Sequence, residues 1–194
     1  MPNRLTLPWT EEQARALEVG EEVFLSGRIV VAREVAHRVL LARDDARFRA
    51  LAQGTIVYHC APVVTRDAQT REWRFLAAGP TPSHRVEPYQ AQVLARYGLR
   101  GVLGQGGMGT RTLAALADHG AVYLHAARGL AVALARCVSR VRGPHLADEL
   151  GLTDAVWSIE VEDFPAVVTM DARGRSLHAA AAECGGAVIE DPAA

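Results

Sequence analysis

The sequence has 194 residues, 49% of them hydrophobic, and a formal net charge of −1. This length suits one compact domain, and the near-neutral charge excludes a general electrostatic field that would recruit nucleic acid or an anionic membrane. All 21 basic residues are arginines, which excludes lysine Schiff-base chemistry and leaves guanidinium groups, suited to carboxylates and phosphates, as the fixed cations.

The beginning of the sequence, MPNRLTLPWTEEQ, lacks the apolar run of a signal peptide. No stretch approaches the ~18 uninterrupted apolar residues that a membrane span requires. We therefore expect a cytoplasmic protein with no membrane and no nucleic-acid partner.

The first elements have clear boundary signals. Thr10 is the expected N-cap of a helix, Gln13 completes a capping box, and Gly20 ends the segment. Residues 22–32, EVFLSGRIVVA, are β-branched and apolar around a central glycine, which predicts a strand, a bend and a second strand. A helical pattern begins at about Arg33.

The middle of the chain alternates between strand and helix patterns. Residues 54–64, GTIVYHCAPVV, predict a short buried strand. Residues 65–81 predict a polar loop and a further strand that leads into the stretch 77–89, AAGPTPSHRVEPY. Residues 88–98, PYQAQVLARYG, predict a helix that ends at its glycine.

Two further strand–turn–helix units follow, at residues 99–120 and 121–141. Residues 154–177 alternate like a pair of strands with a turn at Asp171–Gly174. These elements predict a single compact α/β domain with a mixed sheet over residues 1–178, and a tail at 179–194 that we expect to be flexible.

Three predicted strand-to-helix junctions contain notable residues: Arg33, then Thr81 with Arg85, then the turn Gly104–Gly109. Ligands collect at the carboxyl ends of strands in open α/β sheets, and glycine-rich turns let backbone amides approach ligand oxygens. The pattern predicts a site for a small acid. Ordinary alternatives are a surface ion pair for Arg33, a loop contact for Arg85 and a simple tight turn for GQGGMG.

Other site types have weaker support. GQGGMG lacks the Lys-Ser/Thr pair of a P-loop and has the wrong spacing for a dinucleotide fingerprint. His37 is a packed residue or lines the site, and His84 lies in the loop between Thr81 and Arg85. No two histidines have a metal-ligand spacing, so we expect no zinc or non-haem iron site.

The three cysteines, Cys60, Cys137 and Cys184, are widely spaced and include no C-x-x-C pair. They do not predict a disulfide framework or a zinc site. Three cysteines could in principle ligate an iron–sulfur cluster, but the apolar surroundings of Cys60 and Cys137 favour ordinary buried thiols. We expect no metal site in this chain.

Five stretches together resemble the β component of iron–sulfur-dependent class I hydro-lyases, which include class I fumarases and L(+)-tartrate dehydratase. In chain order they are LSGRIVVAREVAH, AAGPTPSHRVEPY, GVLGQGGMG, GAVYLHAARGLAVAL and DAVWSIEVEDFPAVV. The resemblance runs from about residue 5 to residue 178 and so covers nearly the whole chain.

The resemblance implies a swivelling β/β/α domain that packs against an α component. Three cysteines of that α component would hold a [4Fe–4S] cluster, so this chain would supply no cluster ligand. The active site would lie between the two components. We expect either an α2β2 assembly or, for the isolated β chain, a homodimer.

The resemblance also implies roles for individual residues. Thr81 would be the catalytic base that removes a proton from the carbon beside a carboxylate, in a dry site where its alkoxide is stabilised. Arg85 and Arg33 would bind substrate carboxylates. The turn at Gly104, Gln105 and Gly106 would complete the substrate contacts.

The chain departs from the family pattern at four positions. Glu34 replaces an aspartate, and Pro82 replaces the second threonine of G-P-T-T. Gln105 replaces the lysine of G-K-G, so a charge-assisted contact to a carboxylate is lost. Arg128 replaces a glycine, where it either restores a cation to the site or is a plain surface residue.

We therefore expect the β subunit of a hydro-lyase acting on a small hydroxy-dicarboxylate, and inactive without its α partner. GGMG resembles tartrate dehydratase whereas IEVEDFPA resembles fumarase, so fumarate/malate and tartrate both stay open. Because of Gln105, two alternatives also stay open. The chain is a non-catalytic binding or regulatory paralogue, or its substrate lacks one of the usual carboxylates.

Overall fold

The computed structural model describes residues 3–127 and 129–178. Its strands are β1 (Asn3–Thr6), β2 (Glu22–Val31), β3 (Ile56–Tyr58), β4 (Val63–Arg66), β5 (Trp73–Ala77), β6 (Gly101–Gly104), β7 (Val122–His125), β8 (Val138–His145) and β9 (Val156–Met170). Its helices are α1 (Glu11–Ala16), α2 (Glu34–Ala42), α3 (Ala46–Ala52), the 3₁₀ helix η1 (Ser83–Val86), α4 (Glu87–Tyr97), α5 (Thr110–His119), α6 (Ala131–Arg136) and α7 (Ala147–Asp154). The predicted tail 179–194, Cys184 and Arg128 lie outside the described residues.

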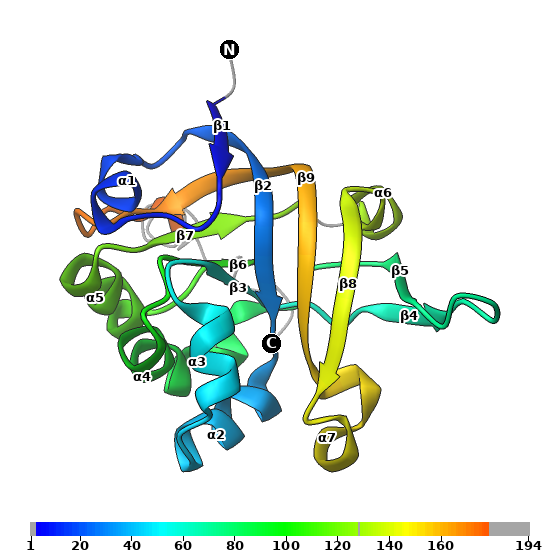
Figure 1. Cartoon of the computed structure of the whole chain (residues 1–194). Helices are drawn as coiled ribbons and strands as arrows, with labels where there is room; N and C mark the ends of the chain where they lie inside the picture. The colour runs from blue at the N-terminus through cyan, green and yellow to red at the C-terminus, as the bar shows by residue number, and fades with distance from the viewer. Residues whose placement is uncertain (1–2, 128, 179–194) are drawn as a thin grey trace, which may run out of the picture.

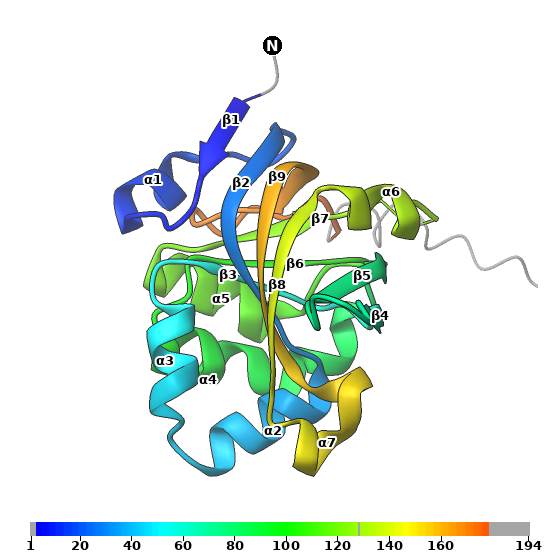
Figure 2. The same cartoon turned by 45° about the vertical axis from the view of Figure 1, so that its right-hand side comes forward.

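Seven strands form a mixed sheet in the order β1-β2-β3-β6-β7-β9-β8, and β4 and β5 form a separate hairpin. Neighbours from β1 to β7 run parallel, whereas β9 runs antiparallel to both β7 and β8. This architecture confirms the predicted α/β fold with a mixed sheet. Helices α2 to α5 lie together on one side of β3, β6 and β7 (Figures 1 and 2).

The long strand β9 has a third neighbour, because it also pairs antiparallel with β2 from Trp157 to Val167. Its last residues pair with β7 instead, where Val168 lies opposite Leu124. The strands β2, β3, β6, β7 and β9 therefore close into a ring. Gly27 permits the bulge in β2, since its φ is +107° and a Cβ there would lie 2.6 Å from the Leu7 carbonyl oxygen.

Two buried cores follow from the alternation of side chains along the strands. Ile56 and Tyr58 of β3 belong to the core inside the ring, together with Trp157 and Phe164 of β9. Val57, between them in the sequence, belongs to a second core that the sheet forms with the helices. The parallel strands are thus covered on both faces, as such strands require.

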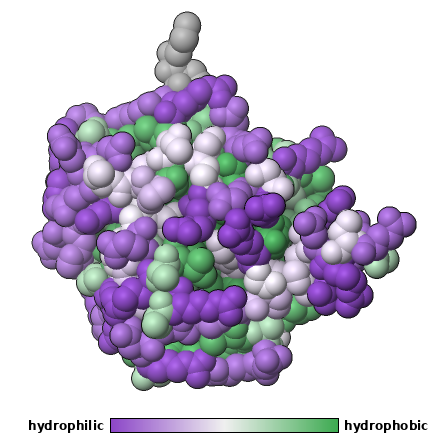
Figure 3. All heavy atoms as spheres, viewed as in Figure 1, coloured by the Kyte–Doolittle hydropathy of each residue, from purple (hydrophilic) through white to green (hydrophobic). Residues whose placement is uncertain are grey.

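The surface is mostly polar on the face seen in Figure 1, with hydrophobic side chains scattered between charged ones (Figure 3). Scattered apolar exposure of this kind is ordinary for a folded domain. No helix in the described part of the chain is both long enough and apolar enough to cross a membrane.

Most of the predicted boundary signals are confirmed, although α1 ends at Ala16, before the expected end at Gly20. Thr10 caps α1, and the Gln13 side chain completes the capping box. Gly98 and Gly120 end α4 and α5 in the left-handed conformation that glycine adopts without strain. Arg33 lies at the junction between β2 and α2, as expected.

Several sequence expectations for individual elements were wrong. Residues 22–31 form one bulged strand, and residues 156–170 form one long strand followed by a single bridge between Met170 and Ser176. The stretch 54–64 divides between β3 and the hairpin strand β4. Residues 138–141, expected to lie in a helix, instead begin strand β8. Strand β1 and helices α3 and α7 were not predicted. Their patterns are short, and long-range packing rather than local periodicity holds them in place.

Asp45 provides a test of this packing. Its carboxylate accepts a hydrogen bond from the Phe48 N–H at 2.7 Å and so caps α3. The same group lies 2.9 Å from His145 Nε2, which ties α3 to the end of β8. We expect Asp45→Ala to lower the free energy of unfolding by about 1–2 kcal/mol, measured by urea denaturation. Asp45→Asn keeps a good cap and should lose less; an equal loss would contradict the capping role.

Candidate functional site

Two loops meet at the carboxyl ends of β3 and β6. The backbone carbonyl of His59, just after β3, accepts hydrogen bonds from the Thr81 N–H at 2.7 Å and from its Oγ1 at 3.0 Å. The Ser83 N–H donates to the Gln105 carbonyl at 3.0 Å, and Pro82 forms an isolated parallel bridge with Gln105. The predicted base and the predicted glycine turn therefore lie side by side.

Gly104 is the close-approach point between these loops. A Cβ at this position would overlap the Ser83 Oγ and lie 3.1 Å from the Tyr123 hydroxyl. Its carbonyl accepts a hydrogen bond from the Ala126 N–H at 2.9 Å, so that oxygen is engaged in the protein itself. Gly106 is exposed and has a φ of +83°, which a side chain would strain. Substrate contacts by these two glycines stay a prediction.

Gln105 is 9% exposed, although it is polar and lies in a turn. Its amide Oε1 has no hydrogen-bond partner among the described residues. A buried polar atom without a partner costs free energy, and such an atom at a candidate site is a natural place for a ligand contact.

His84 and Arg85 lie on η1, directly after the Thr81 loop, and both are exposed. Within the described parts of the chain, neither side chain makes a hydrogen bond or an ion pair. Arg85 is thus a guanidinium that is free to meet an anion four residues after Thr81. Contact of Arg85 or His84 with a substrate stays a prediction.

Arg33 is already paired in this structure. Its Nη1 lies 3.1 Å from the Asp154 Oδ1 at the end of α7, and both side chains are 26% exposed. The pair joins the start of α2 to α7. An Arg33 that binds a substrate carboxylate would have to share its guanidinium with Asp154 or release it.

A chain of buried polar side chains lies behind the Thr81 loop. His59 Nδ1 lies 2.9 Å from the Ser83 Oγ, which also accepts a hydrogen bond from the Tyr123 hydroxyl at 2.9 Å. On the other side, the terminal amide of Gln90 lies 2.9 Å from His59 Nε2 and 3.1 Å from His37 Nε2. These five side chains are fully buried.

His37 is the far end of this chain. Its Nδ1 lies 2.8 Å from the Arg33 carbonyl oxygen, so the neutral imidazole donates its one proton there. Its Nε2 then needs a donor, which requires the Gln90 amide to present its NH₂ group to both imidazoles. Because His37 is fully buried, it supports the site from behind, and a place in the lining stays a prediction.

Burial keeps both imidazoles neutral. It lowers the pKa of His37 to about 4, since a charged ring would lose its hydration. Burial, with the neighbouring His37 as a further cause, lowers the pKa of His59 to about 3. Burial also raises the pKa of Tyr123, so its phenol stays protonated and can donate to Ser83.

His59, Ser83, Gln90 and Tyr123 were missed by the sequence analysis. One signal was available for Gln90, which falls on the same helical face as Val93, Leu94 and Tyr97. A polar residue within a buried helical stripe indicates a buried hydrogen bond.

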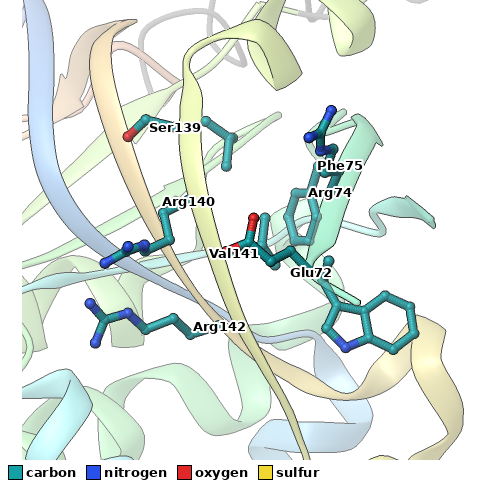
Figure 4. A pocket seen from close by; sticks show the side chains of 9 residues that line it. Glu72, Arg74, Phe75, Ser139, Arg140, Val141 and Arg142 are labelled. Atoms are coloured by element: carbon teal, nitrogen blue, oxygen red, sulfur yellow. The ribbon is translucent and has the colours of Figure 1, made fainter. Parts of the chain in front are cut away.

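A pocket of about 630 Å³ lies elsewhere, between β5 and β8. Figure 4 shows Arg140 and Arg142 on one side of β8, and Glu72, Arg74 and Phe75 on the other. None of the predicted site residues lines this pocket. This pocket is therefore separate from the loop junction where the predicted site residues lie.

The sequence matches the family described as Fumarase C-terminus over residues 3–181. The chain belongs to the Fumarase C-terminus family. This membership confirms the resemblance on which the assignment of Thr81, Arg85 and the Gln105 turn depends, although the roles of those residues stay predictions.

Relatives of this Fumarase C-terminus chain include proteins of two lengths. It is 45% identical over 174 residues to "Putative fumarate hydratase class I" of Geobacillus stearothermophilus, with 90% of this chain and 33% of the relative aligned. It is 33% identical over 172 residues to "Putative L(+)-tartrate dehydratase subunit beta" of Methanocaldococcus jannaschii, with 87% of each chain aligned. It is 30% identical over 178 residues to "L(+)-tartrate dehydratase subunit beta" of Escherichia coli strain K12, with 91% of this chain and 87% of the relative aligned.

The described residues do not fit the [4Fe–4S] cluster that the family implies. They contain no group of three His, Cys, Asp or Glu side chains arranged to hold a metal ion. Cys60 is buried, Cys137 is partly buried, and burial raises the pKa of both thiols, which opposes the thiolate form that ligates iron.

The buried histidines predict a loss of stability in acid. The folded-state pKa values of His37 and His59 lie below the unfolded value of about 6.5. Between these values the two histidines are protonated in the unfolded chain but neutral in the folded chain. The free energy of unfolding should fall as the pH drops from about 6.5 toward 4, by up to about 1.4 kcal/mol per pH unit for each histidine.

Urea denaturation between pH 8 and pH 4.5 measures this slope. His37→Gln should reduce the slope by about one proton, because the substituted chain lacks the buried imidazole that binds a proton only when unfolded. Equal slopes for the wild type and His37→Gln would show that His37 is charged or accessible in the folded state.

Proposed function

We propose that this chain is the β subunit of a heteromeric hydro-lyase that adds water to, or removes it from, a small hydroxy-dicarboxylate. Fumarate/malate is the first substrate candidate and tartrate is the second. The observation that carries the proposal is the Thr81 hydroxyl, held by the His59 carbonyl beside the Gln105 turn. Family membership and the names of the relatives support the reaction class.

Thr81 is the proposed base for the proton on the carbon beside a carboxylate. In this structure its hydroxyl donates to the His59 carbonyl, which suits the protonated form. An alkoxide would be repelled by that oxygen, so the basic form needs cations and donors on its other side. Arg85, which is exposed and lies in η1 four residues after Thr81, is the nearest such cation in the sequence.

The other proposed contacts bind and orient the substrate. Arg85 binds one carboxylate, and Arg33 binds the second in competition with Asp154. The Gln105 amide and the backbone around Gly104 and Gly106 complete the lining of the site. Pro80 and Pro82 on either side of Thr81 restrict its backbone, which limits misplacement of the reacting oxygen.

The proposal assigns the [4Fe–4S] cluster to an α subunit that covers this edge of the sheet. There an open iron would act as a Lewis acid on the substrate. The β chain supplies Thr81, the arginines and the amide, and by itself it would be inactive. The proposed assembly is α2β2, with a homodimer for the isolated chain.

Thr81→Ala tests the proposal directly. In a complex co-expressed with the α partner and reconstituted anaerobically, this change should lower kcat by about 10²–10⁴-fold on malate or tartrate, because proton removal loses its base. Thr81→Ser keeps the hydroxyl and should retain more activity.

The matched control is Thr65→Ala, which removes an exposed threonine from the hairpin strand β4. It should leave kcat within about twofold, since exposed positions far from the site have small effects. Full activity in Thr81→Ala, with an active wild-type complex, would rule out Thr81 as the base.

A non-catalytic or substrate-shifted paralogue is the second candidate, and Gln105 favours it. The residue is 9% exposed and neutral, and its amide Oε1 has no partner among the described residues. A neutral amide cannot replace a cation opposite a carboxylate, but it pairs well with a hydroxyl or an amide. This position therefore suits a substrate with a neutral polar group there, or a partner contact without turnover.

Gln105→Lys separates the two candidates. If the chain is substrate-shifted or non-catalytic, the lysine should raise kcat/KM on dicarboxylates by at least about tenfold, the value of one charge-assisted contact. Gln105→Met, of similar volume, is the uncharged control. Rapid wild-type turnover of dicarboxylates alone, with no gain from the lysine, would exclude the second candidate.

A further inference from the structure

The buried chain Gln90–His59–Ser83–Tyr123, called the buried frame below, has no part in the proposed chemistry. Its four side chains come from α4, the end of β3, the start of η1 and β7. All four are fully buried, and hydrogen bonds of 2.9 Å join each to the next. The frame therefore connects β3 and β7 of the sheet to α4 and to η1, which directly follows the Thr81 loop.

The frame touches both halves of the candidate site through the backbone. On one side, the His59 carbonyl accepts both hydrogen bonds from Thr81. On the other, the Ser83 N–H donates to the Gln105 carbonyl at 3.0 Å. One set of hydrogen bonds thus sets the position of the Thr81 loop relative to the Gln105 turn.

The glycine at position 104 makes this arrangement possible. The Ser83 Oγ lies where a Cβ of residue 104 would be, so the loop sits directly against β6. An apolar side chain at position 83 could fill that space, but its packing would not fix the orientation of the loop as directional hydrogen bonds do. Hydrogen bonds are directional, and a buried set of them selects a single loop position.

We propose that the buried frame is a positioning device that holds Thr81 at a fixed distance from the Gln105 turn, with His59, Ser83 and Tyr123 acting as positioning residues. This inference rests on the proposed function, because it assigns the frame to the same site. Its residues act on the substrate only through Thr81 and the turn, since their side chains are buried away from solvent.

Two variants of this chain test the frame without any activity. Tyr123→Phe removes one hydrogen bond to Ser83 and keeps the ring, and Ser83→Ala removes both side-chain bonds at that position. Each should raise the rate of amide hydrogen exchange at Thr81, whose N–H donates to the His59 carbonyl, by about tenfold.

Tyr97→Phe is the matched control. Tyr97 is also fully buried, and its hydroxyl donates to the Leu40 carbonyl at 2.7 Å, between α4 and α2. The change removes a comparable buried hydrogen bond far along α4 from the loop. The rate of amide hydrogen exchange at Thr81 should stay within about twofold of the wild type. The Tyr97 hydroxyl bonds to no residue of the frame, so its loss should not promote local opening at Thr81.

The same variants in the reconstituted complex test the role in turnover. Tyr123→Phe and Ser83→Ala should lower kcat by about ten- to a hundredfold with KM within twofold, as expected for a misplaced reacting group. Added to Thr81→Ala, neither should cause a further loss, whereas Tyr97→Phe should have no effect in either background.

The outcomes separate the two proposals. Unchanged Thr81 exchange in both frame variants would overturn the frame, whether or not the complex is active. Raised exchange with unchanged kcat in an active complex would overturn its role in catalysis. A wild-type complex with no hydro-lyase activity would reject the proposed function, while the exchange rates would still decide whether the frame positions Thr81.

Discussion

The pairing of β9 with both β2 and β7 is the constraint on which the rest of the molecule depends. β9 runs beside β2 for most of its length and then beside β7, so the sheet must curl into a ring. The ring holds the parallel strands β2, β3, β6 and β7 with their carboxyl ends at one rim. Helices α2 to α5 pack outside it. Arg33 and Gln105 follow β2 and β6, whereas Thr81 and Arg85 follow β5 of the separate hairpin, and hydrogen bonds from Thr81 to the His59 carbonyl hold their loop at the rim.

The rim divides into a rigid buried layer and an exposed charged layer. The buried layer consists of neutral polar groups, since burial keeps His37 and His59 uncharged. The exposed layer has the free guanidinium of Arg85 beside the Thr81 loop. This division suits the proposed chemistry on an anion, because the cation stays hydrated until a ligand arrives while the hydroxyl of the proposed base, Thr81, is already held by the His59 carbonyl.

Much of this arrangement could be read from local sequence signals. The caps at Thr10 and Gly98, and the strand–turn–helix unit around Gly104–Gly109, are local features and were predicted. The sequence placed Thr81 and Gln105 at strand ends on one sheet edge, but Thr81 follows β5 of the separate hairpin. Its closeness to Gln105 comes from its hydrogen bonds to the His59 carbonyl and from the bridge between Pro82 and Gln105. The Arg33–Asp154 pair could not be predicted, because it joins residues 121 positions apart through a helix with a weak pattern. β9 closes the ring by pairing with strands that are far away in the sequence. The periodicity of a single segment does not reveal such partners.

The contact between Ser83 and Gly104 means that the residues allowed at these two positions depend on each other during evolution. A methyl group at 104 is excluded while a hydroxyl occupies 83, and the hydroxyl has its full set of neighbours only while 104 is bare. Substitutions at the two sites should therefore be found together among homologous chains. A chain in which alanine replaces Gly104 must already have lost the serine at 83, or lose it at the same time. Otherwise the new methyl group would overlap the Ser83 Oγ.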